Sequence, residues 1–238
     1  MSAISSPSRS DRRRASLSLP RSRSLAAVLF DWDGTLLDSA DATFRSYRKL
    51  FGSFGIGFDR ARFAETYSPD WYRTYEAVAL PQERWREADS RWIELYAAEE
   101  PRLLAGAVEA VERLRSAGLS TGLVTSGSRG RVERDLAKLG VALLFDVLVC
   151  SEDAPRKKPH PDPLRIALDR LSLESRQAAC VGDSPEDIEM ARAAGVFSVA
   201  IAGSFPNHEA LRKSSADLFA STLAEAAGHL SSMSRGAG

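Results

Sequence analysis

The sequence predicts an α/β fold in which helices cover a parallel β-sheet. From residue 25 onward, short apolar runs that end in polar residues alternate with segments of helical periodicity. The runs have the length of buried strands, and glycine or proline marks the helix ends between them. Five strands are predicted, at 26–30, 121–124, 145–150, 178–181 and 197–201.

Caps and stops define the helices between these strands. Gly118 and Gly140 each follow a segment with apolar residues at helical spacing, and glycine readily adopts the left-handed conformation that ends a helix. Asp162 and Ser184 each precede a proline, which is the pattern of an N-cap followed by the first helical turn. Helices are therefore predicted at 108–117, at 132–139, from Asp162 to Leu171, and from Ser184 to Gly195.

Residues 39–103 interrupt the alternation. They contain no convincing strand but several helical stretches, including 41–50 and 82–96. A helical insert that follows the first strand is expected above the carboxyl ends of the strands, where open α/β sheets bind ligands. Three of its rings share one helical stripe and are interpreted as the insert's own core: Trp85, Trp92 and Tyr96.

The predicted organisation is a discontinuous core, at 25–38 and 104–231, between two terminal tails. The first tail, 1–24, has nine Ser and six Arg with almost no periodic apolar content, and it is predicted to be disordered. The same composition is typical of an organelle transit peptide, and the alternatives are a solvated tail or a misassigned start codon. The second tail is 232–238. We expect a cytoplasmic protein.

Composition and charge exclude several classes of function. The chain has 32 basic and 32 acidic residues, and the first tail is basic while the remainder is mildly acidic, so a nucleic-acid partner is not expected. Cys150 and Cys180 lie in apolar runs without a paired spacing, which argues against disulfides and thiolate metal sites. The longest apolar stretches, 25–30 and 141–150, are too short to span a membrane.

Two carboxylates stand at the end of the first predicted strand. Asp31 and Asp33 leave the strand on the same face, because side chains alternate along a strand. Carboxylates this close repel each other unless a cation lies between them, which suggests Mg²⁺. Gly34 allows a sharp turn at this point. The alternative is a simple turn, since Asp-Gly is a common turn dipeptide.

The second predicted strand also ends in polar residues, ahead of a helix. The hydroxyls of Thr125 and Ser126 and the backbone at Gly127 suit a phosphate oxygen at a helix N-terminus. The alternative is that Ser128 merely caps the helix.

The third and fourth signals follow the next two strands. Lys158 lies in a loop stiffened by prolines and is able to hold a positive charge against a phosphoryl group, unless it is simply solvated. Asp183 ends the fourth strand and would complete a set of oxygen ligands with Asp31 and Asp33. Asp187 is predicted to orient a metal-bound water, although it also has the position of a capping-box acid.

The four signals in this order, each at a strand end, make the chain resemble the haloacid dehalogenase (HAD) superfamily of phosphohydrolases. The resemblance covers about residues 25–230 and is closest to members with a helical C1-type cap, such as phosphoglycolate phosphatases. It implies a Rossmann-like three-layer core, with the five predicted strands in the order 5-4-1-2-3, and a small all-α cap at 39–103.

The resemblance also implies a mechanism. Asp31 is expected to be the nucleophile that forms an aspartyl-phosphate, and Asp33 the general acid and base. Mg²⁺ would be held by Asp31, the backbone carbonyl of Asp33, and Asp183. The residues expected to bind the phosphoryl group are Thr125, Ser126, Gly127 and Lys158.

The expected function is a Mg²⁺-dependent phosphatase for a small phosphorylated metabolite, such as a phosphoglycolate-type compound or a sugar phosphate. The alternatives are an inorganic pyrophosphatase, a nucleotidase, or a non-catalytic binding module. Arg62 and Arg73 are candidates to meet a second anionic group on the substrate, or are solvated. The segment 67–73 departs from the glycine-containing loop common in phosphoglycolate phosphatases. We expect a monomer or homodimer.

Overall fold

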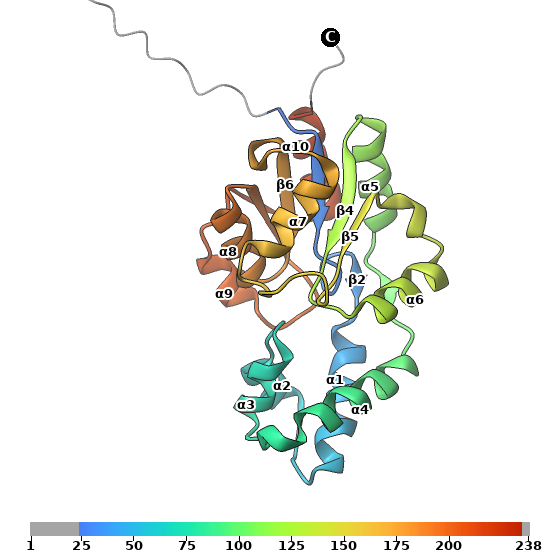
Figure 1. The fold of residues 1–238 in the computed structure, drawn as a ribbon, viewed down its shortest axis with the longest axis vertical. Helices are drawn as coiled ribbons and strands as arrows, with labels where there is room; N and C mark the ends of the chain where they lie inside the picture. The colour runs from blue at the N-terminus through green and yellow to red at the C-terminus, as the bar shows by residue number, and fades with distance from the viewer. Residues whose placement is uncertain (1–23, 235–238) are drawn as a thin grey trace, which may run out of the picture.

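The computed structural model describes residues 24–234, which form an α/β core and a helical cap (Figure 1). The predictions for residues 1–23 and 235–238 lie outside the described residues. Within residues 24–234, no helix has both the length and the apolar character needed to cross a membrane.

The core is built on one six-stranded sheet in the order β5-β4-β1-β6-β7-β8, and every neighbouring pair is parallel. The predicted order of the five strands is confirmed. The additional strand β8 lies at the sheet edge, where Phe219 is exposed, and its apolar run of three residues is shorter than the run expected of a buried strand. The strands are β1 (Ala27–Phe30), β4 (Ser120–Val124), β5 (Val147–Val149), β6 (Ala178–Gly182), β7 (Phe197–Ile201) and β8 (Leu218–Ala220).

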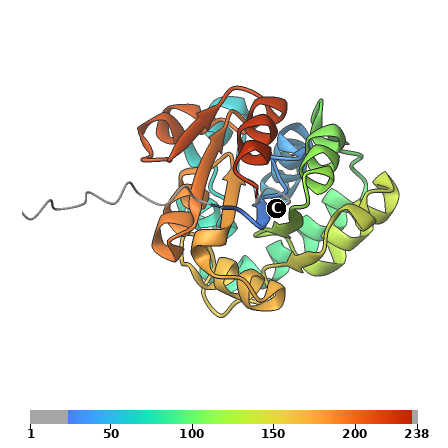
Figure 2. The same ribbon diagram turned by 90° about the horizontal axis from the view of Figure 1, so that it is seen from above.

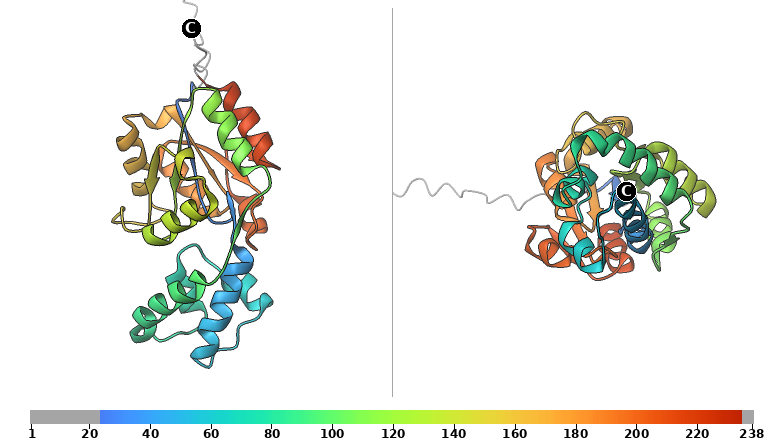
Figure 3. Two further views of the ribbon diagram at one scale, coloured as in Figure 1. Left: turned by 90° about the vertical axis from the view of Figure 1, so that its right-hand side faces the viewer. Right: turned by 90° about the horizontal axis from the view of Figure 1, so that it is seen from below.

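Helices cover both faces of this sheet, which gives the three layers (Figures 2 and 3). One face packs against α5 (Ala107–Ser116), α6 (Arg129–Leu139) and α10 (Leu223–Ser232). The other packs against α7 (Asp162–Leu171) and α8 (Pro185–Ala194), with α9 (His208–Lys213) beside α8. Both faces of the central strands are therefore buried, as their continuous apolar runs require.

The predicted N-cap residue is confirmed at one helix of the core and is wrong at another. The Ser184 hydroxyl accepts the Asp187 N–H, so the predicted N-cap of α8 is confirmed. Asp162 is instead the first residue of α7, and Pro161 stands at the N-cap. The side chain of Asp162 pairs with Arg156 at 2.9 Å, which replaces its expected capping role.

The cap holds α1 (Ala40–Ser53), α2 (Arg60–Thr66), α3 (Trp71–Ala77), the 3₁₀ turn η1 (Gln82–Arg84) and α4 (Trp85–Ala97). The expectation of no strand in 39–103 is wrong at its end. There β3 (Arg102–Leu103) pairs with β2 (Leu37–Asp38), because the two chain crossings between core and cap run side by side. Further 3₁₀ turns, η2 (Ala142–Leu144) and η3 (Ser175–Gln177), precede β5 and β6.

Aromatic contacts hold the cap above the carboxyl ends of the strands. Phe205, in the core loop after β7, belongs to the hydrophobic cluster of the cap, and its ring stacks on Tyr67 with centroids 4.3 Å apart. The ammonium of Lys157 lies 3.8 Å from the centroid of the Trp71 ring, a cation–π contact between core and cap. Trp92 and Tyr96 stack at 4.9 Å along the predicted stripe.

Candidate active site

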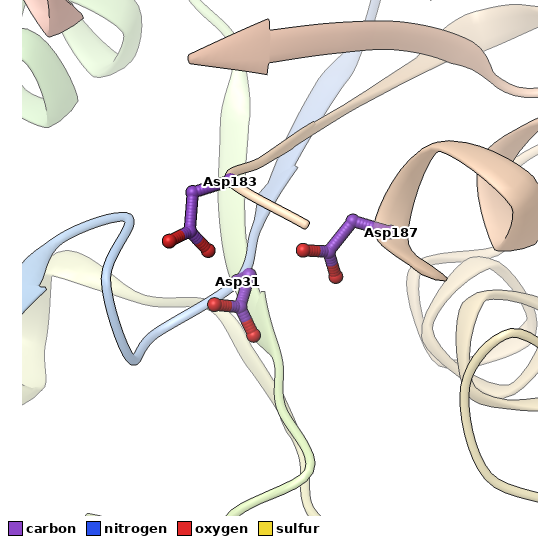
Figure 4. Close-up of side chains that lie close together, drawn as sticks. All are labelled: Asp31, Asp183 and Asp187. Atoms are coloured by element: carbon purple, nitrogen blue, oxygen red, sulfur yellow. The ribbon is translucent and has the colours of Figure 1, made fainter. Parts of the chain in front are cut away.

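Three buried carboxylates meet where β1 and β6 end (Figure 4). Asp31 follows β1, Asp183 follows β6, and Asp187 comes from the first turn of α8. One oxygen from each lies within 4.8 Å of the other two. Neighbouring parallel strands end at the same edge, so the sheet itself brings the first two together.

A lysine partly neutralises this cluster. The Lys158 ammonium donates to Asp31 Oδ1 at 2.6 Å and to Asp187 Oδ1 at 2.7 Å, and all three side chains are buried. Burial by itself lowers the pKa of Lys158, but Asp187 and Asp31 outweigh it and raise that pKa above the usual value. Lys158 is therefore a fixed positive charge beside the Asp31 carboxylate.

One positive charge does not balance three carboxylates. Burial, with a smaller contribution from Asp187, raises the pKa of Asp31 to about 7 against the opposing effect of Lys158. Burial and the neighbouring Asp31 raise the pKa of Asp183 well above its usual value. The cluster lacks positive charge at neutral pH.

The donor set is suited to a hard divalent cation. Asp183 Oδ2 is buried and has no hydrogen-bond partner within residues 24–234, whereas Thr35 donates to Asp183 Oδ1 at 3.3 Å. Gly34, at a φ of +86°, turns the chain past Asp183, and a Cβ there would collide with this carboxylate. An unpartnered carboxylate oxygen beside two further carboxylates is the environment that oxygen-binding cations prefer.

Both carboxylate oxygens of Asp187 already accept hydrogen bonds from the protein. Its Oδ1 accepts from Lys158, and its Oδ2 accepts from the Ser184 N–H at 3.1 Å and the Ser184 hydroxyl at 2.7 Å. These contacts fix the orientation of the Asp187 carboxylate beside Lys158.

Asp33 lies apart from the carboxylate cluster. Its Oδ1 accepts from the Ser39 hydroxyl at 2.8 Å and from Arg131 Nη1 at 3.0 Å, and Arg131 Nη2 bonds Oδ2. The Asp33 side chain is thus bonded to Ser39, where the chain crosses from the core to the cap, and to Arg131 of α6. The Asp33 carboxylate therefore lies outside the group of carboxylates that could hold a cation.

Sequence reasoning missed Arg131. This buried guanidinium also reaches Asp135 at 3.4 Å and lies 5.0 Å from the centroid of the Tyr96 ring in the cap. A Cβ at Gly127 would collide with it, so the glycine after Ser126 makes room for the arginine. The one available signal was an acid four residues after Arg131, which is weak in a chain so rich in arginine.

The loop after β4 brings backbone donors and hydroxyls to the same place. Thr125 is buried and its Oγ1 accepts the Gly127 N–H at 3.0 Å. Ser128 is the N-cap residue of α6, but its side chain makes no capping hydrogen bond, so the capping alternative does not account for it. Together with Ser126, these residues line one cavity.

That cavity, of about 370 Å³, is lined by every predicted catalytic and metal-binding residue. Between core and cap it brings together Asp31, Asp33, Thr125, Ser126, Gly127, Lys158, Asp183 and Asp187.

The cap arginines are not part of this wall. The Arg73 side chain is 63% exposed and lies 3.9 Å from Asp70. Arg62 borders a separate surface hollow. Neither side chain lines the cavity, so the structure does not support the expectation that either faces a substrate anion; Arg62 Nη1 instead donates to the Gly57 carbonyl at 3.3 Å.

Known proteins resemble this chain over most of its length. A family model described as haloacid dehalogenase-like hydrolase matches residues 28–201. A putative pyrophosphatase PpaX of Caldanaerobacter subterraneus is 34% identical, with 82% of this chain and 90% of the relative covered. The validoxylamine A 7'-phosphate phosphatase of Streptomyces hygroscopicus is 31% identical, with 83% and 94% covered. The structure of a predicted phosphoglycolate phosphatase from Haemophilus somnus superposes with a TM-score of 0.78 at 21% identity, covering 87% and 98%.

Proposed function

This chain belongs to the haloacid dehalogenase-like hydrolases, and we propose that it is a Mg²⁺-dependent phosphatase that hydrolyses a small phosphorylated metabolite through an aspartyl-phosphate. The observation that carries the proposal is the position of Asp31. Its carboxylate stands at the end of a central strand, against Lys158 and Asp183, in the floor of a cavity large enough for a ligand.

The first step is the attack of an Asp31 carboxylate oxygen on phosphorus. The bond between phosphorus and the alcohol oxygen breaks, and Asp33 gives that oxygen its proton. Lys158 keeps the nucleophile in place, while the Thr125 hydroxyl, which the Gly127 N–H orients, and the neighbouring Ser126 bind the phosphoryl oxygens. Asp31, the backbone carbonyl of Asp33 and Asp183 would hold Mg²⁺, which offsets the repulsion between the nucleophile and the phosphoryl group.

The second step returns the enzyme to its starting form. Asp33 takes a proton from water, the water oxygen bonds to phosphorus, and the bond between phosphorus and the Asp31 oxygen breaks. Arg131 and Ser39 orient the Asp33 carboxylate between these two proton transfers. Asp31 is thereby regenerated and inorganic phosphate is released.

A pyrophosphatase is the second candidate, because the relative at 34% identity carries that name. A non-catalytic module is not favoured, since all five residues of the expected machinery are present: Asp31, Asp33, Thr125, Lys158 and Asp183. The test is phosphate release from a panel of phosphorylated metabolites and pyrophosphate, with Mg²⁺ or EDTA. Release that requires Mg²⁺ supports the proposal, and release that persists unchanged in EDTA contradicts it.

Asp33→Asn is expected to lower kcat/KM for an alkyl phosphate by about 10²–10⁴-fold, because the leaving alkoxide loses its proton donor. For 4-nitrophenyl phosphate the loss in kcat/KM should be much smaller, since nitrophenolate leaves without protonation. Asp38→Asn is the matched control, because Asp38 is exposed at the same crossing from the core to the cap. Equal losses on both substrates would argue against Asp33 as the general acid.

Mg²⁺ is expected to stabilise the fold, and to do so more at high pH. Burial raises the pKa of Asp31 from 3.8 to about 7, so the folded state binds more protons than the unfolded state between these values. The free energy of unfolding of the metal-free protein therefore falls as pH rises across this window, and Mg²⁺ offsets the loss.

At about 100 times its Kd, Mg²⁺ should add about 2.7 kcal/mol. That corresponds to a rise in Tm of roughly 5–10 °C for a chain of this size. The measurement is thermal unfolding with Mg²⁺ or EDTA at about pH 8 and at about pH 5.5, on either side of the Asp31 pKa. A Tm that Mg²⁺ leaves unchanged at the higher pH would contradict the assignment of the carboxylates as ligands.

A further inference from the structure

The two sides of the cavity differ in chemistry. The core side carries the catalytic carboxylates and all the basic side chains of the wall, whereas half of the residues on the cap side are aromatic. Five rings come from the cap and one from the core loop that enters it: Tyr47, Tyr67, Trp71, Tyr75, Trp92 and Phe205. Since the phosphoryl group must lie against Asp31, the alcohol part of the substrate faces these rings.

The cap side has no positive charge to offer. Among the described residues, none that the cap contributes to the wall is Lys, Arg or His. The one charged group there is the carboxylate of Asp89. A substrate with a second anionic group would place that group against this carboxylate and against aromatic faces, which carry partial negative charge.

The basic residues on the core side already have partners. The Arg131 guanidinium is bonded to Asp33 and Asp135, and the Lys157 ammonium lies over the Trp71 ring. Lys158 is shared by Asp31 and Asp187. To bind a second anion, Arg131 or Lys158 would have to leave a buried carboxylate, at a cost in free energy. Lys157 keeps its ammonium against the electron-rich face of Trp71, so a second anion held by it would also lie against aromatic faces.

Asp89 has acceptor capacity left over. Its Oδ2 accepts from the Tyr72 hydroxyl at 2.9 Å and its Oδ1 from the Tyr75 hydroxyl at 3.2 Å. No ion pair with a basic side chain is found for Asp89 within residues 24–234. A carboxylate has about four lone-pair positions, so roughly two remain to accept hydrogen bonds from a ligand.

Trp92 adds the complementary group. Its indole N–H is buried without an acceptor among residues 24–234, in a side chain that lines the cavity. A hydroxyl group both donates and accepts hydrogen bonds, so hydroxyl groups of a ligand are able to donate to Asp89 and to accept from this N–H. An ammonium group only donates. The carbon-bound hydrogens of a saturated ring cover aromatic surface and exclude water from it.

We infer that the substrate is the phosphate monoester of an uncharged, polyhydroxylated ring, that is, a sugar or cyclitol phosphate. This inference rests on the proposed function and narrows it. We therefore do not expect this chain to prefer substrates that carry a second anionic group on the leaving side, such as pyrophosphate.

The test compares kcat/KM of the full chain with Mg²⁺ on four compounds: glucose 6-phosphate, myo-inositol 1-phosphate, 2-phosphoglycolate and pyrophosphate. We expect at least one of the two ring phosphates to exceed both anionic compounds by tenfold or more. Phosphoethanolamine is included because an ammonium group would also be attracted by Asp89. A preference for phosphoglycolate, pyrophosphate or phosphoethanolamine would overturn the inference while leaving a Mg²⁺-dependent phosphatase intact.

A variant links the preference to the cap. Asp89→Asn keeps an acceptor for the tyrosine hydroxyls but removes the charge, so it should lower the ratio of ring phosphate to phosphoglycolate kcat/KM by about tenfold. The loss should fall mainly on KM for the ring phosphate. Glu94→Gln, exposed on the same helix, is the control and should leave the ratio unchanged. A ratio that Asp89→Asn leaves unchanged would also overturn the inference, whereas failure to hydrolyse any compound would contradict the proposed function instead.

Discussion

Asp31→Asn is expected to abolish turnover while preserving the fold. Asparagine has nearly the same shape as aspartate, but its amide does not attack phosphorus, so kcat should fall by at least about 10⁴-fold, as for other covalent nucleophiles. The substitution also removes the buried charge of Asp31, which raises the pKa of Asp183, so the Tm without Mg²⁺ should not fall by much. Phosphate release and thermal unfolding measure the two effects.

The control for Asp31→Asn is Asp169→Asn, the same change at an exposed position of α7. It should retain wild-type turnover. If Asp31→Asn kept more than a small fraction of the Mg²⁺-dependent activity, another group would have to be the nucleophile.

Lys158→Met is expected to damage both stability and catalysis. The ammonium is the basic partner of two buried carboxylates, so its loss leaves Asp31 and Asp187 uncompensated and should cost about 3–5 kcal/mol of unfolding free energy. A fall in Tm of roughly 6–20 °C follows for a chain of this size. Turnover should fall by about 10²–10³-fold, because a fixed charge at the phosphoryl site is lost.

Measurements of Tm and kcat on Lys158→Met are compared with Lys138→Met, which removes an exposed lysine from α6. Lys158 lowers the pKa of Asp31, so without this lysine Asp31 is neutral at about pH 5.5, and the fall in Tm should be larger at about pH 8. A variant as stable as the wild type at high pH would show that Lys158 does not compensate the carboxylates.

Much of the site could be predicted from sequence because of the geometry of parallel sheets. Each of the strands β1, β4 and β6 delivers polar residues at its carboxyl end, and these ends lie at one edge. Asp31, Thr125 and Asp183 are therefore brought together by strand order alone. Only the local order of apolar and polar residues is needed for that inference.

The features that sequence reasoning missed depend on pairings between distant segments. Arg131 meets Asp33 across 98 positions in the chain, and no local pattern marks such a pair. Arg73 has the residue type expected of an anion site, but the direction in which α3 packs leaves it exposed. The edge strand β8 has an apolar run of only three residues, which is too short to predict a buried strand.

The most direct test of the account is chemical trapping of the phosphorylated enzyme. Borohydride reduces an acyl phosphate to an alcohol, and would thus convert a phosphorylated Asp31 into homoserine. Protein quenched during turnover with Mg²⁺ and substrate is treated with borohydride, digested and analysed by mass spectrometry. We expect homoserine at position 31 in the wild type and none in Asp31→Asn. Unmodified Asp31 in protein that was turning over, or homoserine at a different aspartate, would contradict the central claim.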